Sequence, residues 1–159
     1  RTVPSPKMVK KRAIGKSSMS QPIEDGLKQR IEVIEETYEF MLAYAAQGLS
    51  GNEKAGSGAQ IRDFLNRSYN ALEGLANLFM SLVDEKKLEP TERYRSFIDI
   101  LDRDARNAQA AIQLVLAQTS ISSQLIDNLN AWIHLRALLT DLFLIDEILK
   151  QHSAPDQTH

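Results

Sequence analysis

The sequence predicts an all-α protein, an antiparallel four-helix bundle of long helices, on three observations. Apolar residues recur at alternating intervals of four and three along long segments, which is the spacing of one face of a helix. Glycine, proline and aromatic residues are few, which disfavours a β-rich fold with many turns. Long helices joined mostly by short connections pack as antiparallel neighbours. The predicted helices cover about residues 21–47, 59–87, 90–118 and 122–151.

The first predicted helix follows a basic N-terminal arm, residues 1–19, which we expect to be disordered because it has prolines and no apolar periodicity. Ser20 offers an N-cap, and Pro22 is tolerated in the first turn. Gly48 is the expected left-handed residue after the helix. The apolar line of this helix is Leu27, Ile31, Ile34, Tyr38, Met41 and Ala45.

A glycine-rich stretch, GLSGNEKAGSG, predicts a flexible connection to the second helix. Pro90 ends the second helix and opens the third, because proline lacks the amide that an internal helical position needs. The apolar line of the second helix is Ile61, Leu65, Ser68, Leu72, Leu75, Phe79 and Leu82. That of the third is Tyr94, Ile98, Leu101, Ala105, Ala108, Ile112 and Val115.

The stretch TSISS predicts a turn near Ser120, because its hydroxyl groups compete for the backbone. No glycine or proline enforces this turn, so the third and fourth helices could also form one long bent helix. The fourth helix contains NAWIHLRALLTDLFLIDEILK, which is apolar well beyond one stripe. A polar line at a spacing near seven is typical of a solvent-facing stripe. This line consists of Asp127, Asn130, His134 and Asp141.

The composition is that of one globular domain: the 159 residues include 43% apolar and 25% charged residues. We expect the helical domain to span residues 20–152 and a polar tail to span 153–159. The absence of cysteine excludes disulfides and thiolate chemistry and is compatible with a reducing cytosol. No secretory signal is evident, and the charges inside the fourth helix exclude a membrane span. We therefore expect a cytoplasmic protein.

Candidate chemical sites are few. A ferritin-like metal site would need inward carboxylates on several helices, but Glu32, Glu35, Glu36 and Glu39 crowd one helix. His134 suggests a histidine phosphotransfer bundle as one alternative function. Such domains usually carry lysine and glycine three and four residues after the histidine, where this chain has Ala137 and Leu138. No phosphate loop or catalytic triad is evident. We expect no metal, no cofactor, no small-molecule substrate and no enzymatic activity.

The N-terminal arm carries six basic residues and no acid in residues 1–18, whereas the remaining chain has 13 basic and 21 acidic residues. Basic arms bind phosphate groups without sequence preference, so a nucleic-acid-associated small subunit is a second alternative function. The acidic charge of the remaining chain disfavours binding along the body. The candidate contacts to nucleic acid or another anionic surface are Lys7, Lys10, Lys11, Arg12 and Lys16.

The excess apolar surface of the fourth helix carries the main functional hypothesis. One helix of a bundle needs an apolar stripe about 100° wide, and larger exposed patches usually mark interaction sites. The cover could be a second copy of the chain, a different protein, or the chain's own tail or first helix. The sequence thus predicts a non-enzymatic protein–protein interaction module, a regulatory, adaptor or assembly subunit that self-associates. Its predicted partner-binding anchors are Trp132, Leu135, Leu139, Leu142 and Phe143.

Overall fold

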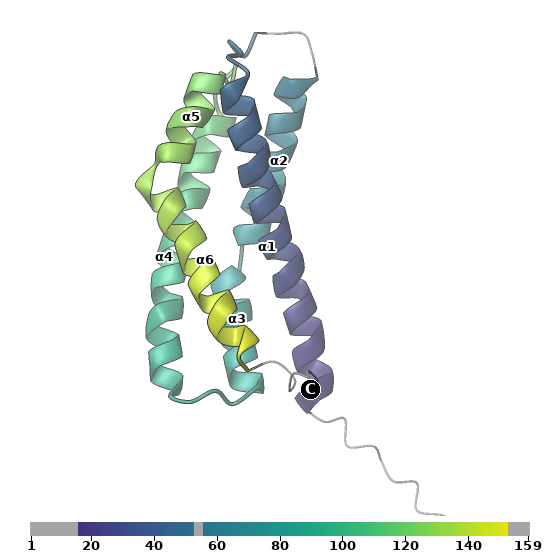
Figure 1. Ribbon diagram of the computed structural model, residues 1–159, viewed down its shortest axis with the longest axis vertical. Coiled ribbons are helices and arrows are strands. Elements are labelled where there is room, and N and C mark those ends of the chain that lie inside the picture. Colours follow the sequence, from purple (N-terminus) through teal and green to yellow (C-terminus); the bar gives the residue numbers. More distant parts are fainter. Residues whose placement is uncertain (1–15, 53–55, 153–159) are drawn as a thin grey trace, which may run out of the picture.

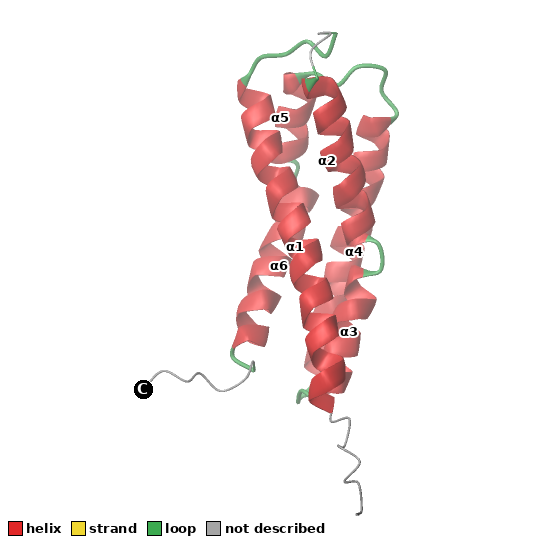
Figure 2. Cartoon of the chain, turned by 90° about the vertical axis from the view of Figure 1, so that its right-hand side faces the viewer, coloured by secondary structure: helices red, strands yellow, loops and turns green. Residues whose placement is uncertain are grey.

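A computed structural model of the chain describes residues 16–52 and 56–152, with side chains from residue 19 onward. This part of the chain is all-helical and contains no strand (Figure 2). The helices lie side by side along the long axis of the molecule (Figure 1). They are α1 (Lys16–Ala46), α2 (Ser57–Leu72), α3 (Leu75–Glu85), α4 (Thr91–Leu116), α5 (Ser123–Ala131) and α6 (Ile133–Lys150).

The prediction of four long helices was wrong in number, because two of them are interrupted. The predicted second helix is divided into α2 and α3 at Gly74, whose φ of 70° is left-handed. Arg30 of α1 stabilises this break by donating hydrogen bonds to the carbonyls of Ala71 and Glu73, which the interruption leaves without helical partners. Both α2 and α3 pack against α1 and α4, so the two helices follow one another along the same neighbours.

The second interruption divides the predicted fourth helix at Trp132, whose ψ of 126° is extended. Its amide donates to the carbonyl of Leu129 at 3.2 Å, and its own carbonyl accepts from the amides of Leu135 and Arg136. Trp132 thus ends α5 and begins α6. The consequence is a change of neighbour: α5 packs against α1, whereas α6 packs against α4.

The connections differ from the predictions at two further points. Helix α1 begins at Lys16, inside the predicted arm, so neither Ser20 nor Pro22 marks its start; Pro22 is an internal residue that forgoes one backbone hydrogen bond. The turn near Ser120 is confirmed, and α4 and α5 are separate helices. Ser122 is the N-cap of α5, and its hydroxyl accepts from the amide of Leu125 at 3.0 Å.

The core follows two of the predicted apolar lines closely. Every residue of the second line is buried, on both sides of the Gly74 break, and only Tyr94 of the third line is half-buried. On α1 the buried face is rotated, so that Thr37 and Tyr44 are buried while Ile31 and Tyr38 lie at the core edge. The Thr37 hydroxyl remains satisfied because it donates to the Val33 carbonyl at 2.7 Å.

Buried hydrogen bonds join the end of α1 to the connection between α4 and α5. The Ser123 hydroxyl donates to the Tyr44 carbonyl at 2.6 Å and accepts from the Leu49 amide at 2.8 Å. The Tyr44 hydroxyl donates to the Ile121 carbonyl at 2.5 Å. Gly51 lies against the backbone of Ile121 at this junction. The upper end of the molecule is therefore held by side chains from distant parts of the chain.

Candidate interaction surfaces

The five predicted anchors do not share one surface. Leu135, Leu139 and Leu142 are buried in the core, at 7%, 7% and 2% exposure, and so present almost no surface to a partner. They point inward because α6 supplies one stripe to the core, and these residues form it. Trp132 is half-buried at the helix break, and Phe143 is 59% exposed.

The first surface is a groove of about 480 Å³ between α4 and α5, which we call the upper groove. It forms where α5 leans toward α1 and away from α4. Its lining is almost entirely apolar: Asn107, Ala110, Ala111, Leu114, Val115, Leu125, Asn128, Leu129 and Trp132. Leu114 stands at its edge with 67% of its surface exposed. Sequence reasoning missed Leu114 because it lies off the buried line of its helix.

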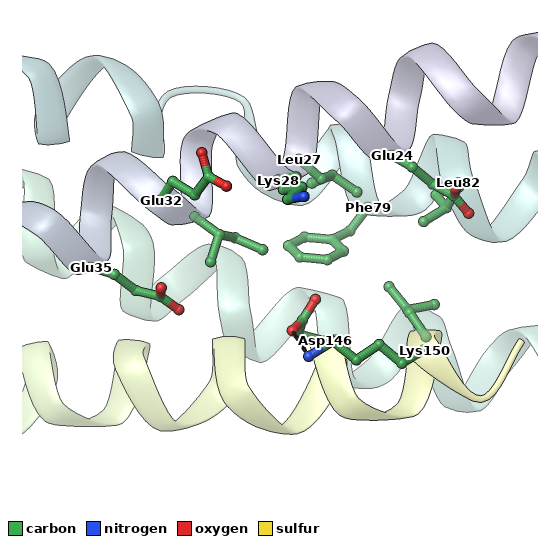
Figure 3. A pocket seen from close by; sticks show the side chains of 11 residues that line it. Glu24, Leu27, Lys28, Glu32, Glu35, Phe79, Leu82, Asp146 and Lys150 are labelled. Carbon is green, nitrogen blue, oxygen red and sulfur yellow. Dashed lines mark ion pairs between the residues drawn. The ribbon is translucent and has the colours of Figure 1, made fainter. Parts of the chain in front are cut away.

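The second surface is a groove of about 420 Å³ between α1 and α6, the lower groove (Figure 3). Buried apolar side chains from α1, α3 and α6 form its floor, and charged side chains from α1 and α6 stand along its walls (Figure 3). The floor contains Leu27, Phe79, Leu82 and Leu149, with Ile31 at its edge. The walls contain Glu24, Lys28, Glu32, Glu35, Asp146 and Lys150.

The electrostatic character of the lower groove is negative. Lys150 pairs with Asp146 at 3.2 Å, and Lys86 of the turn after α3 pairs with Glu24. The hydrogen bond from Lys150 to Asp146 and the charge of that carboxylate raise the pKa of Lys150, with further contributions from Glu147 and Glu35. This ammonium group therefore lies in the field of several carboxylates. The sequence shows that the α1 acids crowd one helix but does not connect them with α6.

The predicted polar line does not face solvent as a whole. Asp127 and His134 are exposed, but Asn130 is 5% exposed and Asp141 is half-buried. The interpretation as one solvent-facing stripe was wrong, because on α5 Asn130 faces the core and on α6 Asp141 lies beside Asp104 of α4. Burial raises the pKa of Asp141 to about 7, and a proton shared with Asp104 of α4 and the negative charge of that residue add to the effect.

Both polar atoms of the buried Asn130 amide lack a hydrogen-bond partner among the described residues. Replacing Asn130 by leucine keeps the number of side-chain heavy atoms and removes this unsatisfied group. We expect the free energy of unfolding to rise by about 1 kcal/mol, the cost of an unpaired buried polar group less some steric strain. Urea denaturation followed by circular dichroism measures the change. Asn66→Leu, at an exposed site on α2, is the control, and a destabilised Asn130→Leu protein contradicts the expectation.

His134 lies in the first turn of α6 with its ring against Trp132, the two ring centroids 4.8 Å apart. Its side chain is exposed. The carboxyl group of Asp141 pairs with Asp104 rather than orienting His134. Among residues 16–52 and 56–152, no group of three histidine, aspartate or glutamate side chains could hold a metal ion.

The predicted nucleic-acid contacts Lys7, Lys10, Lys11 and Arg12 lie outside the described residues, and Lys16 is described only by its backbone at the start of α1. Three arginines of α2 and α4, Arg62, Arg67 and Arg106, have local partners among the described residues. Arg67 pairs with Asp63 at 3.0 Å and Arg106 with Asp102 at 2.9 Å, each across one helical turn. Arg62 instead caps the end of α4 by donating to the carbonyls of Leu116 and Gln118.

Within the part of the chain that the structure describes, every helix is too short or too polar to cross a lipid bilayer. No protein-family model, curated protein or solved structure matches the chain.

Proposed function

We propose that the chain is a non-enzymatic protein–protein interaction module, a regulatory, adaptor or assembly subunit that self-associates. The scaffold we propose for it is an antiparallel four-helix bundle in which α2–α3 and α5–α6 each form one interrupted member. The observation that carries the proposal is the upper groove, an apolar hollow that ends at the half-buried Trp132. Apolar surface of this kind on a folded chain usually marks a contact with another protein.

The surroundings of the upper groove favour a second copy of the chain as the partner. Leu114 projects from α4 beside a hollow whose lining includes the small side chains of Ala110 and Ala111. A projecting side chain next to a hollow on the same face is self-complementary, because a two-fold axis places each projection in the other copy's hollow. Ile133 and Leu144, exposed by 72% and 51%, are further apolar side chains on the neighbouring α6.

Sedimentation velocity of the full chain tests this proposal. We expect dimers at tens of micromolar, and we expect Leu114→Glu to weaken the dimer by at least about tenfold, because it places a charge in the contact. Leu114 is exposed, so the substitution should leave the fold intact, which circular dichroism verifies. Asn66→Glu adds the same charge to an exposed site on α2 and should not change the dimer. A monomer at every concentration, or equal effects of both substitutions, contradicts the proposal.

Trp132 provides a second measurement, since it is the only tryptophan in the sequence. Burial of its indole in a dimer should move its fluorescence emission to shorter wavelength as the concentration rises. The Leu114→Glu protein should keep the monomer spectrum over the same range. An emission spectrum that is independent of concentration while the chain dimerises would place the interface elsewhere.

A further inference from the structure

The lower groove is a second surface, separate from the upper one. It lies between α1 and α6 because α6 packs against α4 below the Trp132 break and leaves α1. In Figure 3 the side chains of Leu27 and Phe79 lie between the two helices, and the charged side chains follow the groove lengthwise. The floor residues are at most 8% exposed, so the base of the groove is the apolar core itself.

The two walls are continuous helix faces. On α1, the lining residues Glu24, Lys28, Glu32 and Glu35 are spaced by four, four and three residues, which places them on one face. On α6, Asp146 and Lys150 line the groove at a spacing of four. Phe143, the exposed residue among the predicted anchors, lies three residues before Asp146 on the same face. The wall of α6 therefore continues upward with a large apolar side chain.

The charges of the walls are not balanced by ion pairs among residues 16–52 and 56–152. Glu24 and Asp146 have the ion-pair partners Lys86 and Lys150. Glu32 and Glu35 have no ion-pair partner among the described residues. The groove is lined by two lysines, and of these Lys150 is in an ion pair, whereas Lys28 is in none with a described residue. A bound group that brings positive charge to Glu32 and Glu35 would gain attraction, whereas an acidic one would be repelled.

We propose that the lower groove binds a cationic amphipathic helix of a partner protein. An amphipathic helix places its apolar residues at intervals of three and four in an apolar groove, and lysine or arginine residues at its edges meet the acidic walls. The apolar face would pack against Ile31 at the edge of the floor and against Phe143, and the basic residues would approach Glu32 and Glu35. This site goes beyond self-association and uses a different surface of the molecule.

A designed peptide serves as the probe. It has about 20 residues, enough for a stable helix, with leucine on one face and lysine on the other, and carries a fluorescent label. Its counterpart has glutamate in place of every lysine. In fluorescence anisotropy with the full chain, we expect the lysine peptide to bind. We expect its affinity to fall as salt is added, because part of the attraction is between charges. The glutamate peptide should not bind measurably.

Substitutions in the chain locate the contact. Glu35→Lys and Glu32→Lys should each lower the affinity for the lysine peptide by at least about tenfold, because the attraction between charges becomes repulsion. Glu36→Lys is the matched control: Glu36 is exposed, adjacent to Glu35 and outside the groove lining, so its effect should be below about twofold. Phe143→Ala removes an exposed apolar side chain without changing the charge. It should lower the affinity for the lysine peptide by about fivefold.

Several results would overturn the proposal. These are binding of both peptides with equal strength, no binding of the lysine peptide, or equal effects of Glu35→Lys and Glu36→Lys. Binding that is seen only after Lys7, Lys10, Lys11 and Arg12 are replaced by glutamine would assign the groove to the chain's own N-terminal residues. Leu114→Glu distinguishes the two surfaces, because it should remove the dimer and leave peptide binding unchanged.

Discussion

Replacing Gly51 by alanine is expected to lower the free energy of unfolding by about 3 kcal/mol and the melting temperature by about 10 °C. Gly51 has a φ of 91°, which residues with a side chain rarely adopt. A Cβ at this position would lie 2.9 Å from the backbone C and N atoms of Ile121. Those atoms cannot move freely, because the Ile121 carbonyl accepts the buried Tyr44 hydroxyl and Ser123 ties the same connection to Leu49.

Two other glycines separate the causes of this effect. Gly48 has a φ of 65° but would place its Cβ in open space, so Gly48→Ala should cost only about 1 kcal/mol of backbone strain. Gly58 lies in α2 with an ordinary φ and open space, and Gly58→Ala should stabilise the protein by about 0.5 kcal/mol. Thermal unfolding by circular dichroism ranks the three variants. A Gly51→Ala protein no less stable than Gly48→Ala would show that the contact with Ile121 is absent.

The helical content and the core positions could be predicted from the spacing of apolar residues. Burying a line of apolar side chains on one helix face stabilises the fold whether or not the helix is continuous. The second line therefore remains buried on both sides of Gly74. The line predicts which residues are inside but is insensitive to a break in the helix. Gly74 is a visible signal for the first break, since glycine readily adopts positive φ.

The second break could not be predicted in the same way. The residues around Trp132 have no glycine or proline, and the extended ψ of Trp132 is held by tertiary packing rather than by its own propensity. Once the break is missed, the faces of α5 and α6 are assigned as one. The sequence pattern also placed Asn130 and Asp141 in solvent and counted Leu135 as surface. Six apolar residues of α6 belong to the core, whereas Ile133, Phe143 and Leu144 are exposed.

The Trp132 break also explains why there are two grooves. Above it, α5 packs against α1, and the upper groove opens toward α4. Below it, α6 packs against α4, and the lower groove opens toward α1. One local change in backbone direction therefore produces an apolar hollow on one side and an acid-walled one on the other. A continuous helix would contact both neighbours along its length and would close both grooves.

The carboxyl group of Asp141 should make the stability of the protein depend on pH. Its Oδ2 is buried and has no hydrogen-bond partner in the described part of the chain, and the neighbouring acid is Asp104 on α4. The pKa of Asp141 is raised from 3.8 to about 7 in the folded protein, mainly by burial and further by the proton shared with Asp104 and its charge. The folded state therefore holds this proton more tightly than the unfolded state. The contribution of Asp141 to stability is favourable below about pH 4 and declines as the pH rises toward 7.

Asp141→Asn should accordingly raise the free energy of unfolding by about 2 kcal/mol at pH 8, because the amide remains neutral and can donate to Asp104. This figure is about half of what the full pKa shift implies, since the half-buried carboxyl is partly screened by water. Near pH 4 the two proteins should be equally stable, and the difference should grow between pH 4 and 7. Urea denaturation at a series of pH values measures it, with Asp127→Asn as the exposed control on α5. A difference that is independent of pH, or a less stable variant at pH 8, would show that Asp141 is ionised without cost and that the contact between α4 and α6 holds no shared proton.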